Sequence, residues 1–190
     1  MSDYTEDIEK ALKVLRDGGI ILYPTDTIWG IGCDACNPKA VEKVYKLKQR
    51  AESKSMLVLV DSIGMLERYV KEVPEVGIQL IELSEKPCTL VLDDAQGLAP
   101  NLIANDGSVG FRVSRDPFSR DLCRALRKPM VSTSANISGY SAPAIFSEIA
   151  PEIVDNVDYV VNWRREETTK SAPSSVIKIS ADGQFKILRP

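Results

Sequence analysis

The most consequential absence from this chain of 190 residues is histidine. Without an imidazole, no Ser-His-Asp or Cys-His arrangement can form, so mechanisms built on a histidine base are excluded. Zinc sites that combine cysteine with histidine ligands are excluded for the same reason. Any site must be built from other side chains.

Long apolar runs are also absent. No stretch approaches the ~20 residues needed to span a bilayer, and the N-terminal segment is acidic and lacks a signal-peptide core. We therefore expect a cytoplasmic protein. Hydrophobic residues make up 44% of the chain and charged residues 27%, which is typical of a globular protein, and the length fits a single domain over 1–190. The net charge of −3 gives no global attraction to nucleic acid, although a local basic surface is compatible with it.

Cysteines are few, and their spacing favours no metal or redox site. Cys33 and Cys36 form a C-x-x-C pair, while Cys88 and Cys123 are isolated. A zinc site would need a second close pair of cysteines or histidines. A thioredoxin-like motif would stand at a helix start after a strand, a placement that Cys33 and Cys36 match only loosely. We interpret the four as reduced cysteines, the first two near a turn, and expect no metal site.

The familiar nucleotide-binding signatures are missing. Gly30-Ile31-Gly32 lacks the third glycine of the dinucleotide fingerprint, because position 35 is alanine. The chain contains no G-x-x-x-x-G-K-[ST] phosphate loop and no acidic cluster typical of a two-metal site. A bound nucleotide would therefore be held by hydroxyls, backbone amides and arginines.

Apolar periodicity predicts alternating strands and helices, and hence one layered α+β (mixed α/β) domain. Thr5 is expected to cap a first helix that Gly18-Gly19 ends, and Asn37-Pro38 is expected to begin a second. A C-terminal hairpin predicts a mixed sheet. Strands are expected at 20–23, 56–60, 89–92, 109–113, 130–134, 159–161, 175–179 and 185–188, and further helices at 63–70, 75–83, 117–126 and near 145–150.

Small polar residues cluster in three places where predicted strands begin or end. The clusters are Thr25-Asp26-Thr27, Ser132–Asn136 and Ser171–Ser175. Each alone is typical of local turn hydrogen bonding, but three in one chain indicate a binding site.

Cations supply the other half of the expected site. Arg112 lies within a predicted strand and faces opposite to Phe111 and Val113, so it needs an anionic partner or open solvent. Lys48, Arg50 and Lys54 follow a predicted helix end, where cations also offset the helix dipole.

Together these segments resemble the YrdC/Sua5 family of threonylcarbamoyl-AMP synthases, which catalyse the first step of the t6A modification of tRNA. The resemblance rests on Tyr23-Pro-Thr-Asp-Thr27 with Gly30 and Gly32, on Lys48-x-Arg50, and on Ser132–Asn136 with Ser138-Gly139. It runs in order from about Ile8 to Pro190 and is closest to the short single-domain form. It implies a three-layer fold around a twisted mixed β-sheet, with helices on both sides and the ligands in a basic concave cleft.

The resemblance also implies roles for particular residues. Thr27, Arg112, Ser132 and Ser174 match threonine contacts, and Lys48 and Arg50 match the catalytic pair at the reacting centre. The residues that match ATP contacts are Arg50, Lys54, Ser134, Asn136 and Arg189.

The implied substrates are ATP, L-threonine and bicarbonate. Mg²⁺ is expected to arrive with ATP, assisted by water held at Asp26, and no tightly bound cofactor is expected. Implied partners are RNA and the downstream proteins of t6A transfer, with no membrane.

The sequence departs from the family pattern at several places. Lys54-Ser55 replaces a usual Lys-Pro or Asn-Pro, and Glu85–Thr89 lacks the glycine of Pro-Gly-Pro-x-Thr. Arg112-Val113-Ser114 replaces Arg-x-Pro, and Leu59 stands where some members have histidine. These changes concern loop geometry and leave the cationic and hydroxyl positions in place.

Two alternative functions are compatible with parts of the pattern. A non-enzymatic RNA-binding module of the same fold would stack bases on Trp29, Tyr45 or Tyr140, although aromatic residues make up only 6% of the chain. A sugar-phosphate synthase using Mg²⁺ would need an acidic metal cluster, which the sequence does not show.

Overall fold

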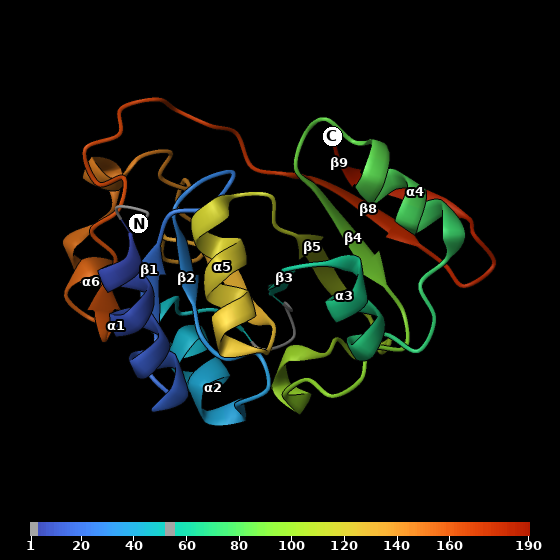
Figure 1. Ribbon diagram of the computed structural model, residues 1–190, viewed down its shortest axis with the longest axis horizontal. Helices are drawn as coiled ribbons and strands as arrows, with labels where there is room; N and C mark the ends of the chain where they lie inside the picture. The colour runs from blue at the N-terminus through green and yellow to red at the C-terminus, as the bar shows by residue number, and fades with distance from the viewer. Residues whose placement is uncertain (1–3, 52–55) are drawn as a thin grey trace.

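A mixed, twisted sheet runs through the centre of the molecule (Figure 1). The computed structural model describes residues 4–51 and 56–190, and the strands of this part are β1 (Ile21–Tyr23), β2 (Gly30–Gly32), β3 (Leu57–Val60), β4 (Cys88–Leu92), β5 (Val109–Val113), β6 (Met130–Ser134), β7 (Tyr159–Val160), β8 (Ser175–Ile179) and β9 (Phe185–Arg189). Their order is β7-β1-β2-β6-β3-β5-β4-β8-β9. The pairs β7–β1, β3–β5 and β4–β8 are parallel and the others antiparallel, which confirms the mixed sheet.

Helices cover both faces of the sheet. Leu15 of α1 (Thr5–Arg16) and Leu122 of α5 (Pro117–Leu126) pack with Tyr23 and Leu59 on one face. The alternate strand residues point the other way, into a larger core built with α2 (Pro38–Leu47), α3 (Ile63–Tyr69), α4 (Glu75–Leu83) and α6 (Pro151–Val154). The result is the expected three-layer arrangement. Within the described residues, no helix has the length and apolar character to cross a membrane.

Local sequence explains where several of these helices begin. Asn37 caps α2, because its Oδ1 accepts hydrogen bonds from the backbone N–H groups of Lys39 (3.1 Å) and Ala40 (3.2 Å), as the Asn37-Pro38 pair predicts. Asp116 caps α5 in the same way, accepting from the N–H of Ser119 at 2.8 Å. The prediction for Thr5 was wrong. Tyr4 holds the cap position of α1, and Thr5 is the first helical residue.

Two other segments differ from the sequence prediction. The Gly30–Gly32 segment, which the expected strands did not include, is the strand β2, which pairs with β1 and β6. The helix expected near 145–150 is a short 3₁₀ turn, η2 (Phe146–Glu148), followed by α6. Pro151 explains this break, because the residue before a proline is disfavoured in the α conformation, and Ala150 is extended with ψ of 139°.

Candidate active site

A cavity of about 330 Å³ opens on the face of the sheet that also carries α1 and α5. Leu59 packs beneath α5 and pairs with Arg112, so alternation places both side chains on this face. The wall of the cavity comes from segments far apart in the sequence. Its polar lining residues are Thr25, Thr27, Arg50, Thr89, Arg112, Ser132, Thr133, Ser134, Ser174 and Arg189.

Two glycines form part of the floor of the cavity. A Cβ atom at Gly30 would lie 3.3 Å from Oγ of Ser132, and one at Gly110 would lie 3.3 Å from Cγ2 of Thr89. Side chains at these positions would fill the space available to a ligand. Gly32 has a different role, because a Cβ there would lie 2.6 Å from Cε1 of Tyr23. Its small size is required by core packing and not by the cavity.

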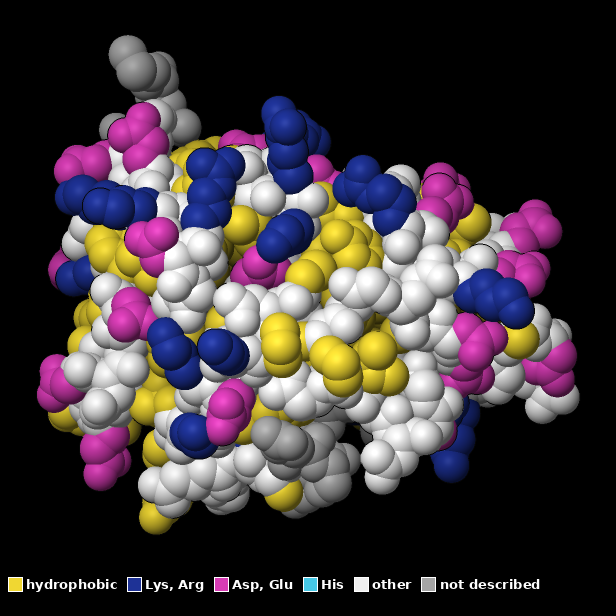
Figure 2. Space-filling model, turned by 90° about the horizontal axis from the view of Figure 1, so that it is seen from below, with side chains coloured by type: hydrophobic (Ala, Val, Ile, Leu, Met, Phe, Trp, Pro, Cys, Tyr) yellow, Lys and Arg dark blue, Asp and Glu magenta, His cyan; other side chains and the backbone are white. Residues whose placement is uncertain are grey.

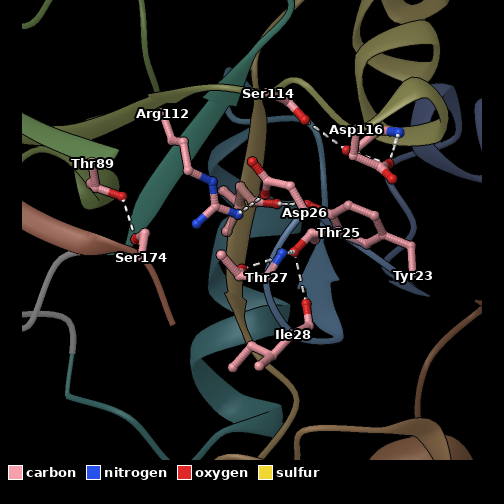
Figure 3. A network of polar contacts seen from close by, with 12 residues as sticks. Tyr23, Thr25, Asp26, Thr27, Ile28, Thr89, Arg112, Ser114, Asp116 and Ser174 are labelled. Atoms are coloured by element: carbon pink, nitrogen blue, oxygen red, sulfur yellow. Dashed lines mark hydrogen bonds and ion pairs between the residues drawn. The ribbon is translucent and has the colours of Figure 1, made fainter. Parts of the chain in front are cut away.

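The two threonines of the Thr25–Thr27 loop have different roles, one in holding the turn and one in lining the cavity. Thr25 Oγ1 donates to the carbonyl of Ile28 at 2.8 Å and accepts from the backbone N–H of Thr27 at 3.0 Å (Figure 3). Thr25 therefore holds the turn, the local role typical of a threonine in a loop. Thr27 is 6% exposed and lines the cavity.

Arg112 is paired on one side of its guanidinium. Nη2 lies 3.1 Å from Oδ1 of Asp26, and the two side chains are 4% and 12% exposed. Nε of Arg112 is buried and finds no hydrogen-bond partner within the described residues. Burial raises the pKa of Asp26, and the positive charge of Arg112 opposes that rise. The anionic partner that the sequence required is thus Asp26, and an unsatisfied donor remains on an arginine that lines the cavity.

The opposite wall carries a second hydroxyl pair. Oγ of Ser174 lies 2.8 Å from Oγ1 of Thr89 in a buried contact (Figure 3). Arg189 completes this wall, and its Nε donates to the carbonyl of Ser174 at 2.9 Å. A β-bulge at Leu188 makes this possible, since Ile187 pairs with Ile177 and Arg189 with Val176. In regular alternation Arg189 would share the face of Ile187, but the bulge turns it toward the cavity.

Ser132 and Ser134 lie on β6, two residues apart, and both line the cavity together with Arg50. This spacing places them on one face of the strand, as the period of two requires. Burial lowers the pKa of Arg50. Arg50 follows Gln49, whose φ of 49° ends α2 and turns the chain.

Lys48 lies behind the cavity wall. It is 1% exposed, and its Nζ donates to the carbonyls of Ser134 (2.5 Å) and Asn136 (2.7 Å). Burial, and then the nearby charge of Arg50, lower the pKa of Lys48 to about 8. The contacts hold the backbone that follows β6, and the side chain of Asn136 continues this support by donating to the carbonyl of Tyr140 at 2.7 Å.

The structure therefore brings together seven of the residues predicted from sequence. Thr27, Arg50, Arg112, Ser132, Ser134, Ser174 and Arg189 line one cavity. Lys48 and Asn136 support its wall from behind. Lys54 lies outside the described residues.

Sequence reasoning missed three contributors. Thr89 was assigned to a strand and to the segment that departs from Pro-Gly-Pro-x-Thr, with no role in the site, and Arg164 and Asp116 were not considered. Arg164 Nη1 donates to the carbonyl of Thr25 at 3.0 Å and to Oδ1 of Asp116 at 3.2 Å. The run Arg164-Arg165-Glu166-Glu167 reads as an exposed charged loop, so no sequence signal separated Arg164 from its neighbours.

Features that would support the RNA-binding alternative are weak. Trp29 and Tyr45 are each 3% exposed, so neither can stack on a base, while Tyr140 is 76% exposed. On the face shown in Figure 2, lysine and arginine side chains alternate with acidic ones and form no continuous basic field. All four cysteines are free, and no cluster of three or more acidic or cysteine side chains suited to a metal occurs among the described residues.

Comparison with known proteins decides the family. A family model described as Sua5/yciO/yrdC, telomere recombination, matches residues 13–190. The chain belongs to the Sua5/yciO/yrdC family. A protein of Pseudoalteromonas translucida named threonylcarbamoyl-AMP synthase is 30% identical over 187 residues, which cover 97% of this chain and 98% of that protein.

Solved structures of the Sua5/yciO/yrdC family share the fold. E. coli YciO aligns with a TM-score of 0.83 at 24% identity, over 97% of this chain and 88% of YciO. P. abyssi Sua5 complexed with L-threonine aligns with a TM-score of 0.82 at 23% identity, over 92% of this chain. The aligned region spans 51% of that Sua5 chain. These structural likenesses show that the sheet and its two helical layers are those of the family.

Proposed function

We propose that the protein is a threonylcarbamoyl-AMP synthase, which forms L-threonylcarbamoyladenylate and pyrophosphate from L-threonine, bicarbonate or CO2, and ATP. The observation that carries the proposal is the convergence of Arg112, Arg50 and Arg189 with seven hydroxyl side chains on one cavity. Relatives named for this activity match nearly the whole chain. An enzyme of this class would supply the activated intermediate for t6A modification of tRNA.

The reaction needs no nucleophile from the protein, which agrees with a chain that lacks histidine. The threonine amine adds to CO2 and gives a carbamate, and a carbamate oxygen attacks the α-phosphorus of ATP as pyrophosphate leaves. The work left to the protein is alignment of the reactants and stabilisation of developing negative charge. Alignment of this kind can lower a barrier by roughly 7–11 kcal/mol.

The geometry suggests a division of the cavity into two halves. In the threonine half, Arg112 binds the substrate carboxylate, since Asp26 occupies only its Nη2 side and its buried Nε lacks a partner. Thr27, Ser132 and Ser174 contact the polar atoms of threonine. The carboxylate, ammonium and hydroxyl groups of threonine suit a pocket that joins one cation to several hydroxyls.

In the ATP half, Arg50, Ser134 and Arg189 contact the nucleotide and its phosphates, and Asn136 shapes the loop that follows β6. Lys48 acts on this half through its hold on the backbone carbonyls of residues 134 and 136. This assignment differs from the direct role at the reacting centre that the resemblance implies. The reason is that Lys48 is only 1% exposed and its ammonium already donates to two backbone carbonyls.

Magnesium is assigned to the substrate as its ATP complex. Asp26, expected to hold a water for the ion, instead pairs with Arg112, so we assign it no metal role. The hand-off of the product to RNA-modifying proteins and any direct contact with RNA belong to the same proposal.

The proposal is tested by incubating the pure protein with ATP, Mg²⁺, bicarbonate and isotopically labelled threonine. Mass spectrometry should detect the mixed anhydride with the label, and threonine-dependent ATP–pyrophosphate exchange should accompany it. Arg50→Ala and Arg112→Ala should each abolish most of the exchange. Salt-dependent RNA binding without any threonine-dependent ATP turnover would instead support an RNA-binding module.

A further inference from the structure

Arg164 stands in an unusual backbone conformation beside the candidate site. Its φ is 63°, in the left-handed region that non-glycine residues adopt at a cost. Its side chain is 26% exposed and its guanidinium is used on every side. Nη1 donates to the carbonyl of Thr25 (3.0 Å) and to Asp116 (3.2 Å), and Nε donates to Glu167 at 2.6 Å. A strained residue with three contacts of this kind is typical of a functional constraint rather than of a surface loop.

The two partners on Nη1 belong to different segments: Thr25 lines the cavity, and Asp116 follows β5, the strand that carries Arg112. Thr25 opens the loop that carries Asp26 and Thr27. Asp116 lies four residues after Arg112 and caps α5 through the N–H and hydroxyl of Ser119, whose Oγ lies 2.8 Å from Oγ of Ser114. In Figure 3, Ser114 and Asp116 lie on the segment that leaves β5, near Asp26 of the Thr25–Thr27 loop. Arg164 is thus a second link, beside the Arg112–Asp26 pair itself, between the Thr25–Thr27 loop and the segment that follows β5.

The backbone just before Arg164 is held firmly. Asp7 on α1 is 6% exposed and accepts from the N–H groups of Asn162 (3.0 Å) and Trp163 (2.8 Å) and from the hydroxyl of Tyr159 (2.5 Å). Arg164 therefore projects from a fixed point. Beyond it, the chain crosses the top of the molecule in Figure 1 and returns to the cavity at Ser174.

We propose that Arg164 is a positioning residue for the threonine half of the site, setting the relative placement of Thr27 and Arg112 without touching the substrate. This inference rests on the proposed function. Arg164 is expected to act on the threonine half alone, because the ATP half is supported by Lys48, which binds the backbone of residues 134–136. Loss of Arg164 should therefore weaken threonine binding and leave nucleotide binding intact.

The variant Arg164→Gly tests this inference. Glycine adopts the left-handed conformation freely, so the backbone turn is kept while the guanidinium and its contacts with Thr25 and Asp116 are removed. The chain supplies a matched control in Arg127, which also has a left-handed φ (60°) but is exposed at the C-terminal end of α5. Isothermal titration of wild type, Arg164→Gly and Arg127→Gly with L-threonine and with ATP, in bicarbonate-free buffer, measures the two halves separately.

We expect Arg164→Gly to lower threonine affinity on the order of tenfold, the scale of a small misplacement of binding groups, with ATP affinity within about twofold of wild type. Arg127→Gly should change neither. Equal threonine affinity in Arg164→Gly and wild type overturns the inference, as does an equal loss for both ligands. A wild type that binds ATP but no threonine refutes the proposed function itself.

A second variant covers the case in which Arg164→Gly does not fold. Arg164→Lys keeps the charge, but its single ammonium can replace only Nη1 toward Thr25 and Asp116. It cannot also make the contact of Nε with Glu167 that fixes the guanidinium in place. Its threonine affinity should fall between those of wild type and Arg164→Gly. Thermal melts of each variant establish folding before titration. Wild-type threonine affinity in folded Arg164→Lys and Arg164→Gly proteins would reject a positioning role.

Discussion

Nζ of Lys48 lies 2.7 Å from the carbonyl oxygen of Asn136, and the lysine is almost completely buried. This ammonium group is removed from water and held by two backbone carbonyls, and it forms no ion pair with a carboxylate of the described residues. The contact joins the end of α2 to the loop after β6. It therefore connects two motifs that are 86 residues or more apart in the sequence.

This burial predicts a pH dependence of stability. The pKa of Lys48 falls from 10.5 to about 8, so between these values the unfolded chain binds more protons than the folded one. The free energy of unfolding should accordingly rise with pH across this window, by at most about 3 kcal/mol from this group. Urea denaturation of wild type and Lys48→Met at pH 7.5 and pH 10 isolates the effect, because other groups titrate alike in both. A wild-type-minus-variant difference that stays constant with pH would contradict it.

Removing the ammonium should also act on nucleotide binding. In Lys48→Met the carbonyls of Ser134 and Asn136 lose their donor, at a cost of about 1–3 kcal/mol for buried groups left unsatisfied. We expect weaker ATP binding and nearly unchanged threonine binding, the reverse of the pattern for Arg164→Gly. Lys46→Met is a suitable control, since Lys46 is exposed and pairs with Glu42 on the surface.

The Arg112–Asp26 pair predicts that Arg112 contributes to stability as well as to binding. Arg112→Met leaves the Asp26 carboxylate buried without its cation, which should cost about 3 kcal/mol at neutral pH. Burial already raises the pKa of Asp26, and loss of Arg112 raises it further. Protonation then relieves the cost, so the deficit in melting temperature should shrink as the pH falls from 7 toward 4. Arg112→Met with Asp26→Asn should recover stability but not threonine binding.

Much of the fold could be predicted because burial follows simple periods. The bounds of α4, α5, β5 and β6 match the apolar patterns to the residue. Arg112 was placed correctly because strand alternation requires it to face away from Phe111. Arg189 shows the limit of that argument, since its orientation depends on a bulge at Leu188 that alternation does not predict.

The remaining features depend on tertiary contacts that no local pattern encodes. Lys48 resembles any cation at a helix end, and only the fold places two carbonyls over its ammonium. β2 contains two glycines and no alternation, so its strand character comes from the partners β1 and β6. Arg164 likewise acquires its role from Thr25 and Asp116, which lie 139 and 48 residues away.

The cysteines differ in their expected reactivity. Cys33 and Cys123 are 0% exposed and burial raises the pKa of each thiol, whereas Cys36 and Cys88 are half-buried. An alkylating reagent at pH 8 should modify Cys88 and Cys36 in the native protein and leave the other two intact until denaturant is added. Peptide mapping by mass spectrometry identifies the sites. Native-state labelling of Cys123 at the rate of Cys88 would contradict the packing of α5 on β3.

Asp7 should be among the residues most costly to replace outside the cavity. Burial would raise its pKa, but hydrogen bonds from Tyr159, Asn162 and Trp163 outweigh this and lower it. Asp7→Ala leaves the N–H groups of Asn162 and Trp163 without their acceptor, which we expect to cost about 3 kcal/mol.

Because the pKa of Asp7 is lowered in the folded state, the contribution of its carboxylate to stability is present above pH 3.8 and declines as the pH falls through the folded value. Glu6→Ala is the control, since Glu6 is exposed and forms a surface ion pair with Lys10. Urea denaturation should show a large loss for Asp7→Ala alone, and threonine affinity should fall with it, because the segment leading to Arg164 is released. If threonine affinity is kept in folded Asp7→Ala protein, the anchoring of Arg164 does not depend on α1.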